Sequence, residues 1–156
     1  MRNFDEKYLQ MAKIWSTNSY AIRHKVGAII VKDGIIISDG FNGTPAGFEN
    51  ECEEVIPCGH SCSNLFDKNC GLCSERKLQT KPYVLHAEAN AILKVAKSAN
   101  STEGATLYCT LSPCIECAKL IIQAGIIRVV YIEEYRDVAG LELLKRANIE
   151  IEQLKI

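Results

Sequence analysis

The sequence predicts an α/β fold, a three-layer α/β/α sandwich built on a mixed sheet of about five strands. Three observations lead to this prediction. Two β-branched runs separated by a short turn sequence indicate an antiparallel hairpin. Helical and strand-like segments alternate in the second half, which favours parallel pairing. The length of 156 residues suits one domain, so we expect a single domain over 1–156 with a Cys-rich insertion at about 52–82.

The first elements expected are a helix and a hairpin. Apolar residues recur at helical spacing over residues 4–17, which predicts an amphipathic helix. The β-branched runs at 26–31 and 35–38 flank the turn sequence KDG, a pattern typical of strand, tight turn and strand. The sequence GFNGTPAG at 40–47 is expected to form a loop.

Residues 52–82 show almost no periodicity and are expected to be irregular, whereas the rest of the second half alternates helices and strands. Helices are predicted at 86–99, 114–124 and 138–147, and strands at 105–110, 127–132 and 149–154. Pro113 suits a helix start, because the N–H that proline lacks would have no partner there.

Composition restricts the partners. The chain has 18 Lys plus Arg and 19 Asp plus Glu, and this net charge of -1 favours a small substrate over a nucleic acid polymer. No stretch approaches the roughly 20 apolar residues of a membrane-spanning helix, so we expect no membrane partner and a cytoplasmic location. In that reducing compartment, the 8 cysteines are expected to be metal ligands, reactive thiols or core residues rather than disulfides.

Two short motifs indicate the chemistry. His86-Ala87-Glu88 is followed later in the chain by Pro113-Cys114-Ile115-Glu116-Cys117. The order H-x-E, then P-C-x-x-C, is the signature of zinc deaminases. One histidine and two cysteines leave the fourth position of a tetrahedral zinc ion open, as in a catalytic site. We therefore predict His86, Cys114 and Cys117 as zinc ligands and Glu88 as the residue that moves protons.

Each motif also has a simpler interpretation when it is taken alone. A histidine at a helix start is often a cap or a core residue, and a C-x-x-C pair can be redox active or structural. The occurrence of both motifs in this order, in the expected helical and strand contexts, favours the catalytic interpretation. Cys109, on a predicted strand, is expected to be a core thiol.

Three segments carry a resemblance to a known family: GFNGTPAG at 40–47, HAEANAIL at 86–93 and TLSPCIECAK at 110–119. Together they resemble the deoxycytidylate (dCMP) deaminase family, a branch of the cytidine deaminase superfamily. The resemblance implies hydrolytic deamination of dCMP to dUMP and ammonia, which supplies thymidylate synthesis. In many members of this family dCTP with Mg²⁺ activates and dTTP inhibits, so the resemblance also implies such regulation, together with a homo-oligomer, commonly a hexamer.

The resemblance assigns further site residues. It implies that Asn42, Ala87 and Tyr135 bind the substrate, and that Gly40 and Gly43 approach a bound nucleotide and are candidates for an effector loop. It implies attack on cytosine C4 by a zinc-activated hydroxide, with Glu88 protonating N3.

The 5′-phosphate of such a substrate needs positive charge or N–H donors. Arg23, Lys25 and Arg136 are candidates by their position in the sequence alone. Surface charges of this kind are more often simply solvated.

The Cys-rich segment departs from many members of that family, in which the insertion is shorter, although some carry a second, structural zinc there. A closed tetrahedral site needs four ligands. The candidates are Cys58, His60, Cys62, Cys70 and Cys73, with Cys52 as a sixth option. The sequence does not choose among them, and a loop of free thiols is the alternative.

Three rival functions stay open at this point. The chain can act on another base, such as a nucleoside or a tRNA adenosine, although its net charge does not favour tRNA. It can be a non-catalytic zinc-binding relative, against which the presence of Glu88 argues. The third rival function is that of a redox protein that uses Cys70 and Cys73 as its dithiol.

Overall fold

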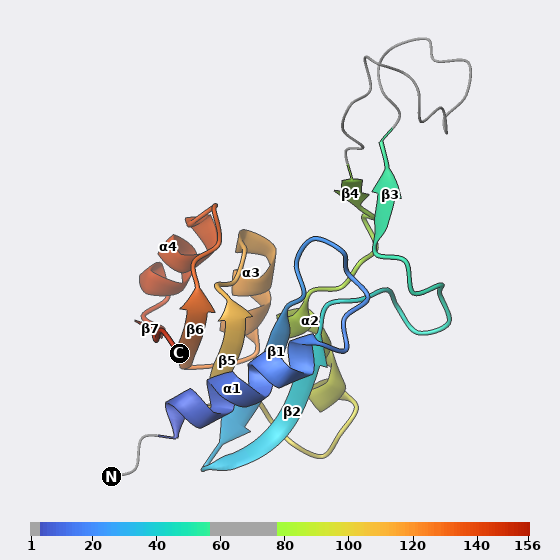
Figure 1. Ribbon diagram of the computed structural model, residues 1–156. Helices are drawn as coiled ribbons and strands as arrows, with labels where there is room; N and C mark the ends of the chain where they lie inside the picture. Colours follow the sequence, from blue (N-terminus) through green and yellow to red (C-terminus); the bar gives the residue numbers. More distant parts are fainter. Residues whose placement is uncertain (1–3, 57–77) are drawn as a thin grey trace, which may run out of the picture.

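The computed structural model describes residues 4–56 and 78–156, and its main feature is a five-stranded sheet between two helical layers (Figure 1). In chain order the elements are α1 (Asp5–Ser16), β1 (Gly27–Lys32), β2 (Ile35–Phe41), β3 (Glu53–Val55), β4 (Leu78–Thr80), α2 (Ala87–Ala96), β5 (Thr106–Leu111), α3 (Ile115–Gln123), β6 (Arg128–Glu133), α4 (Ala139–Arg146) and β7 (Glu150–Gln153).

The strand order is β2-β1-β5-β6-β7, and the sheet is mixed as predicted. β1 pairs antiparallel with β2 and β5, whereas β5, β6 and β7 are parallel. The tight β1–β2 turn has Asp33 and Gly34 at φ 51° and 76°, and positive φ at both central residues matches the strand twist of a hairpin. α3 and α4 supply the crossovers that parallel neighbours need.

Two apolar layers hold the helices on the sheet. α1 covers one face, where Leu9 packs with Ile29, and α2, α3 and α4 cover the other, where Ala91 and Ile121 pack with Ile30 (Figure 1). Adjacent strand residues point to opposite faces, so Ile29 and Ile30 serve different layers. The cytidine deaminase-like three-layer arrangement predicted from the sequence is confirmed.

Two predicted boundaries were wrong by more than one residue. β2 runs through Gly40 and Phe41, so the loop expected at 40–47 begins two residues later. Gly40 belongs in the strand because α2 lies against it: a Cβ there would come within 2.2 Å of the Ala87 carbonyl oxygen. α2 ends at Ala96, short of the predicted 99.

The segment expected to be irregular contains a short ribbon. β3 pairs antiparallel with β4, and Glu53 lies opposite Thr80 in the register. This ribbon stands apart from the main sheet in Figure 1. Strands of three residues are too short to give a period in the sequence, which is why they were not predicted.

An ion-pair network ties the first turn of α1 to the sheet. Arg128 on β6 donates to both carboxylate oxygens of Asp5, at 3.1 and 2.9 Å, and Tyr108 donates to Asp5 at 2.6 Å. Arg128 also contacts Glu150 and Glu152 on β7. The hydrogen bond from Arg128 lowers the pKa of Asp5 below the ordinary 3.8.

We expect Asp5→Asn to lower the free energy of unfolding by about 2 kcal/mol at pH 7, because charge-assisted hydrogen bonds are lost. Since the folded-state pKa of Asp5 is lowered, this contribution is present above the unfolded-state value of 3.8 and is lost as pH falls through the folded-state value. Urea unfolding at pH 7 and below pH 3.8 measures the change.

Glu6→Gln is the matched control, because Glu6 is an exposed carboxylate in the same helical turn. It should change the free energy of unfolding by less than about 0.5 kcal/mol. A deficit in Asp5→Asn that stays constant with pH would argue against the assigned ionisation.

Candidate active site

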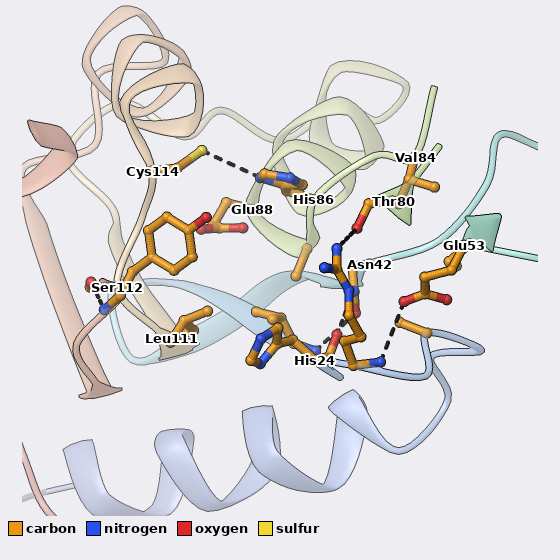
Figure 2. Close-up of a pocket in the computed structure, with 16 residues that line it drawn as sticks. His24, Asn42, Glu53, Thr80, Val84, His86, Glu88, Leu111, Ser112 and Cys114 are labelled. Atoms are coloured by element: carbon orange, nitrogen blue, oxygen red, sulfur yellow. Dashed lines mark hydrogen bonds between the residues drawn. The ribbon is translucent and has the colours of Figure 1, made fainter. Parts of the chain in front are cut away.

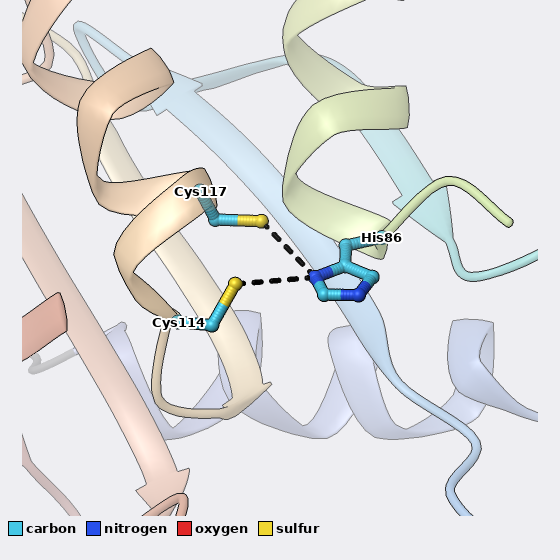
Figure 3. Close-up of side chains that lie close together, drawn as sticks. All are labelled: His86, Cys114 and Cys117. Atoms are coloured by element: carbon cyan, nitrogen blue, oxygen red, sulfur yellow. Dashed lines mark hydrogen bonds between the residues drawn. The ribbon is translucent and has the colours of Figure 1, made fainter. Parts of the chain in front are cut away.

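The three predicted metal ligands meet where two helices begin (Figure 3). His86 is the N-cap of α2 and Cys114 the N-cap of α3, both with extended backbone, while Cys117 lies in the first turn of α3. The helix therefore begins after Cys114, one residue later than predicted, and Pro113 precedes the cap. His86 Nδ1 lies 3.4 Å from the Sγ atoms of both Cys114 and Cys117.

These distances fit tetrahedral zinc. Zinc binds sulfur at about 2.3 Å and imidazole nitrogen at about 2.1 Å, so two such ligands at a tetrahedral angle lie about 3.6 Å apart. The three donor atoms all lie within 4.8 Å of one another. Three protein ligands leave the fourth position open, which is the arrangement of a catalytic zinc site.

The charge at Cys114 also suits a cation. A hydrogen bond with Cys117, and a second with His86, lower the pKa of Cys114 to about 3. The start of α3 adds the favourable end of a helix dipole. The hydrogen bond between the two cysteines raises the pKa of Cys117, so the proton that the pair shares stays on Cys117. Cys114 is therefore suited to bind a metal as a thiolate, and a metal ion would displace the remaining proton.

Glu88 is a buried carboxylate beside this cluster, in the first turn of α2 (Figure 2). Its side chain is 3% exposed, and Oε2 has no hydrogen-bond partner among the described residues. Burial raises the pKa of this carboxyl. A buried, unpartnered carboxylate oxygen is costly, and such a group inside a cavity is suited to exchange a proton with a bound molecule.

A cavity of about 130 Å³ lies in front of the cluster (Figure 2). His86, Glu88 and Cys114 line it, and so do all three predicted substrate residues, Asn42, Ala87 and Tyr135. The sequence thus predicted a set of residues that the fold brings to one pocket.

Asn42 and Tyr135 are each held by specific contacts. Asn42 Oδ1 accepts from the Val26 N–H at 2.8 Å, and its Nδ2 donates to the His24 carbonyl at 2.8 Å. The N–H of Tyr135 donates to Ser112 Oγ at 2.8 Å, and Ser112 is itself buried. Asn42 therefore orders the segment between α1 and β1, and Ser112 places Tyr135.

Four polar pocket residues were missed as site residues by sequence reasoning: His24, Glu53, Thr80 and Ser112. Ser112 stood inside the quoted motif, and His24 lies within the basic run Arg23-His24-Lys25. Glu53 and Thr80 had no signal, because they lie in short strands without periodicity.

The three phosphate candidates fall in different places. Arg23 lines the pocket, whereas Lys25 lines a neighbouring hollow that shares Arg23 and His24 with it. The guanidinium of Arg136 lies 5.9 Å from the centre of the Tyr135 ring, and Arg136 does not line the pocket. Arg23 is therefore the candidate whose position fits best.

Gly40 and Gly43 have clear packing and pairing contacts. Gly40 is buried between β2 and α2, as described above. Gly43 donates to the Leu85 carbonyl at 3.0 Å and accepts from the Leu85 N–H at 2.8 Å, which fixes the residue before His86. An effector role for these glycines stays a prediction.

The candidate ligands of a second zinc, Cys58, His60, Cys62, Cys70 and Cys73, lie outside the described residues, and so does the pair invoked for a redox function. Cys52, the sixth option, is 1% exposed and lines the pocket.

A close packing contact supports Cys114 from behind. Gly140, at the start of α4, lies so near the segment before α3 that a Cβ would come within 2.1 Å of the Pro113 carbonyl oxygen and 2.7 Å of the Cys114 carbonyl carbon. Both contacts are with backbone, which cannot rotate away as a side chain can. The position of a metal ligand thus depends on a missing side chain in α4.

We expect Gly140→Ala to cost about 1–3 kcal/mol of stability through overpacking, and to speed the loss of zinc to a chelator. Denaturant unfolding and chelator competition measure the two effects. Gly43→Ala is the control for added volume, because a Cβ there meets only the Phe41 ring, at 3.9 Å. Equal zinc retention in both variants would argue against the support assigned to Gly140.

Comparisons with known proteins agree with this site. The family model for the cytidine and deoxycytidylate deaminase zinc-binding region matches residues 2–133. The deoxycytidylate deaminase of Enterobacteria phage T4 is 38% identical over 165 residues, covering 92% of this chain and 86% of that protein. The human deoxycytidylate deaminase is 37% identical over 135 residues, covering 85% of this chain and 66% of the human protein.

A solved structure shows the same fold. The crystal structure of the dCMP deaminase from cyanophage S-TIM5, in complex with dCMP and dUMP, superposes with a TM-score of 0.80. Its sequence is 40% identical, and the alignment covers 99% of this chain and 98% of that one.

Proposed function

The chain belongs to the cytidine and deoxycytidylate deaminase family, and on that premise we propose that it converts dCMP to dUMP and ammonia, which supplies dUMP for thymidylate synthesis. The observation that carries the proposal is the buried Glu88 carboxylate, which faces the same pocket as the His86 and Cys114 donor atoms. The relatives named above support dCMP as the substrate.

His86, Cys114 and Cys117 would hold the zinc ion. When bound, zinc supplies a Lewis acid that lowers the pKa of water toward 7, so that a nucleophile is present at neutral pH. His86 and Cys114 line the pocket, so a zinc ion held by them and by Cys117 at the start of α3 would be within reach of a bound base.

Glu88 moves the protons of the reaction. Its Oε2, which has no partner in the described part of the chain, takes a proton from the attacking water and passes it to N3 of the cytosine, while the water oxygen forms a bond to C4. In a second transfer, Glu88 carries the proton of the new C4 hydroxyl to the amino group. The bond from C4 to that nitrogen then breaks, which releases ammonia and leaves the C4 carbonyl of dUMP. Because burial raises the pKa of Glu88, the carboxyl readily accepts the proton that it must carry.

The rest of the pocket orients the nucleotide. Tyr135 and Ala87 lie near the reacting base, and Asn42 lies at the wall formed by the segment between α1 and β1. We assign the 5′-phosphate to Arg23 and His24, since both line the pocket and Arg23 carries a fixed positive charge.

Ammonia release from zinc-loaded protein tests this function, with dCMP, CMP, deoxycytidine and dCTP offered in parallel. Fast turnover of dCMP alone would establish the reaction and the need for the 5′-phosphate. Fast turnover of another base or nucleoside would favour a different deaminase. Turnover of none would favour a non-catalytic zinc-binding relative.

Several features remain predictions from the resemblance: a hexamer, activation by dCTP with Mg²⁺, inhibition by dTTP, and a structural second zinc. Activation would appear as a sigmoidal rate curve in dCMP that becomes hyperbolic with dCTP. The cytoplasmic location is also a prediction. Across residues 4–56 and 78–156, the structure contains no helix with the length and hydrophobicity needed to cross a membrane.

A further inference from the structure

The stretch 22–25 between α1 and β1 forms part of one wall of the pocket, yet apolar burial barely holds it. Residues 22–25 are exposed, and the Ile22 side chain is 71% exposed. Polar contacts therefore locate this segment. Asn42 holds its second half through His24 and Val26, as described above.

The ribbon of β3 and β4 holds the first half. The Ile22 N–H donates to both carboxylate oxygens of Glu53, each at 3.1 Å, and the Arg23 N–H donates to Glu53 Oε1 at 3.4 Å. From the opposite strand, Thr80 Oγ1 accepts a hydrogen bond of 2.6 Å from the Arg23 guanidinium. Figure 2 shows Glu53 and Thr80 at this side of the pocket.

Glu53 and Thr80 are cross-strand partners, so one rung of the ribbon holds Arg23 at two points. Glu53 fixes its backbone and Thr80 fixes the end of its side chain. A free arginine side chain has many rotamers, and fixing it on binding costs conformational entropy. When the side chain is already ordered before the substrate binds, this entropy cost no longer weakens binding. The Glu53 carboxylate also has its oxygens turned to N–H donors, which reduces its repulsion of a bound phosphate.

We propose that the Glu53–Thr80 rung is a specificity determinant: it positions Arg23 for the phosphate of the substrate and so favours the nucleotide over the nucleoside. This inference rests on the proposed function. Neither residue touches the reacting atoms; both are positioning residues that act through Arg23. The β3–β4 ribbon flanks residues 57–77 in the sequence, and its Glu53 and Thr80 belong to the wall of the pocket.

Steady-state kinetics of Glu53→Ala and Thr80→Val test the proposal. For Glu53→Ala we expect KM for dCMP to rise about tenfold and kcat to stay within about threefold, because the zinc cluster and Glu88 are untouched. Thr80→Val keeps the shape of the side chain and removes only the hydroxyl, so we expect KM for dCMP to rise about threefold. Deoxycytidine lacks the phosphate, and its kcat/KM should change less than about twofold.

Where deoxycytidine turnover is too slow to measure, its inhibition constant against dCMP replaces kcat/KM. A double-mutant cycle adds a second readout. In an Arg23→Ala background, Glu53→Ala should have almost no further effect on KM for dCMP, because both changes remove the same contact. Zinc content should equal that of the wild type in every variant.

Glu54→Ala is the matched control, since Glu54 is the exposed carboxylate next along β3. Its kinetics should be those of the wild type. Equal losses on dCMP and deoxycytidine, or an additive effect in the Arg23→Ala background, would overturn the positioning role. A wild-type protein that does not deaminate dCMP would overturn the proposed function itself, which is a different result.

Discussion

Glu88→Gln is expected to lower kcat by about 10²–10⁴-fold while the zinc content stays at the wild-type level. Glutamine has nearly the shape of glutamate but cannot take up and release a proton at neutral pH. The ligands His86, Cys114 and Cys117 are unchanged, so the loss would be one of proton transfer. Ammonia release and metal analysis on the same preparation measure the two quantities.

The same variant should be as stable as the wild type or more stable. Glu88 is 3% exposed and Oε2 lacks a partner among the residues described, so the wild type bears the cost of burying a carboxyl group with an unsatisfied oxygen. A neutral amide lowers that cost. Active-site residues often lower the stability of an enzyme. Thermal unfolding measures this effect, and the melting temperature of Glu88→Gln should equal or exceed that of the wild type.

Glu116→Gln is the control, because Glu116 is an exposed carboxylate on α3 between the two cysteine ligands. It should keep nearly full activity, since its ion pair with Lys119 is on the surface. Full activity in Glu88→Gln would remove Glu88 from the mechanism.

The grouping of His86, Glu88, Cys114 and Cys117 could be predicted from the sequence because each part of it is local. His86 and Glu88 lie at one helix start, and Cys114 and Cys117 lie three residues apart at another. The alternation of strands and helices then specifies parallel strands, which bring the two helix starts to the same edge of the sheet.

The part of the pocket formed by β3 and β4 could not be predicted, because its contacts join residues that are far apart in the sequence. Glu53 contacts Ile22 across 31 positions of the chain, and Arg23 contacts Thr80 across 57. Nothing in local composition relates such residues, and strands of three residues show no period. Gly40 was also misinterpreted from the sequence. Glycine suggested a loop there, but the residue lies in a strand, and its lack of a side chain lets a helix pack against that strand.

Cys114→Ser is expected to release one equivalent of zinc relative to the wild type and to lower kcat/KM by about 10³-fold or more. A serine hydroxyl stays protonated near neutral pH, so it does not replace the thiolate as a ligand. Because the zinc content of the variant is compared with that of the wild type, any zinc bound elsewhere in the chain contributes equally to both and cancels. Cobalt substitution gives an independent readout through the absorbance of cobalt–thiolate bonds, which should weaken.

Cys109→Ala is the matched control, because Cys109 is a fully buried thiol on β5 that takes no part in the cluster. It should lower stability by about 1 kcal/mol through a small cavity and keep its zinc. If Cys114→Ser kept the full zinc complement and the cobalt–thiolate absorbance, Cys114 would not be a ligand. The geometry opposes that outcome, since His86 Nδ1 lies at 3.4 Å from each cysteine sulfur, close to the edge length of a tetrahedral zinc site.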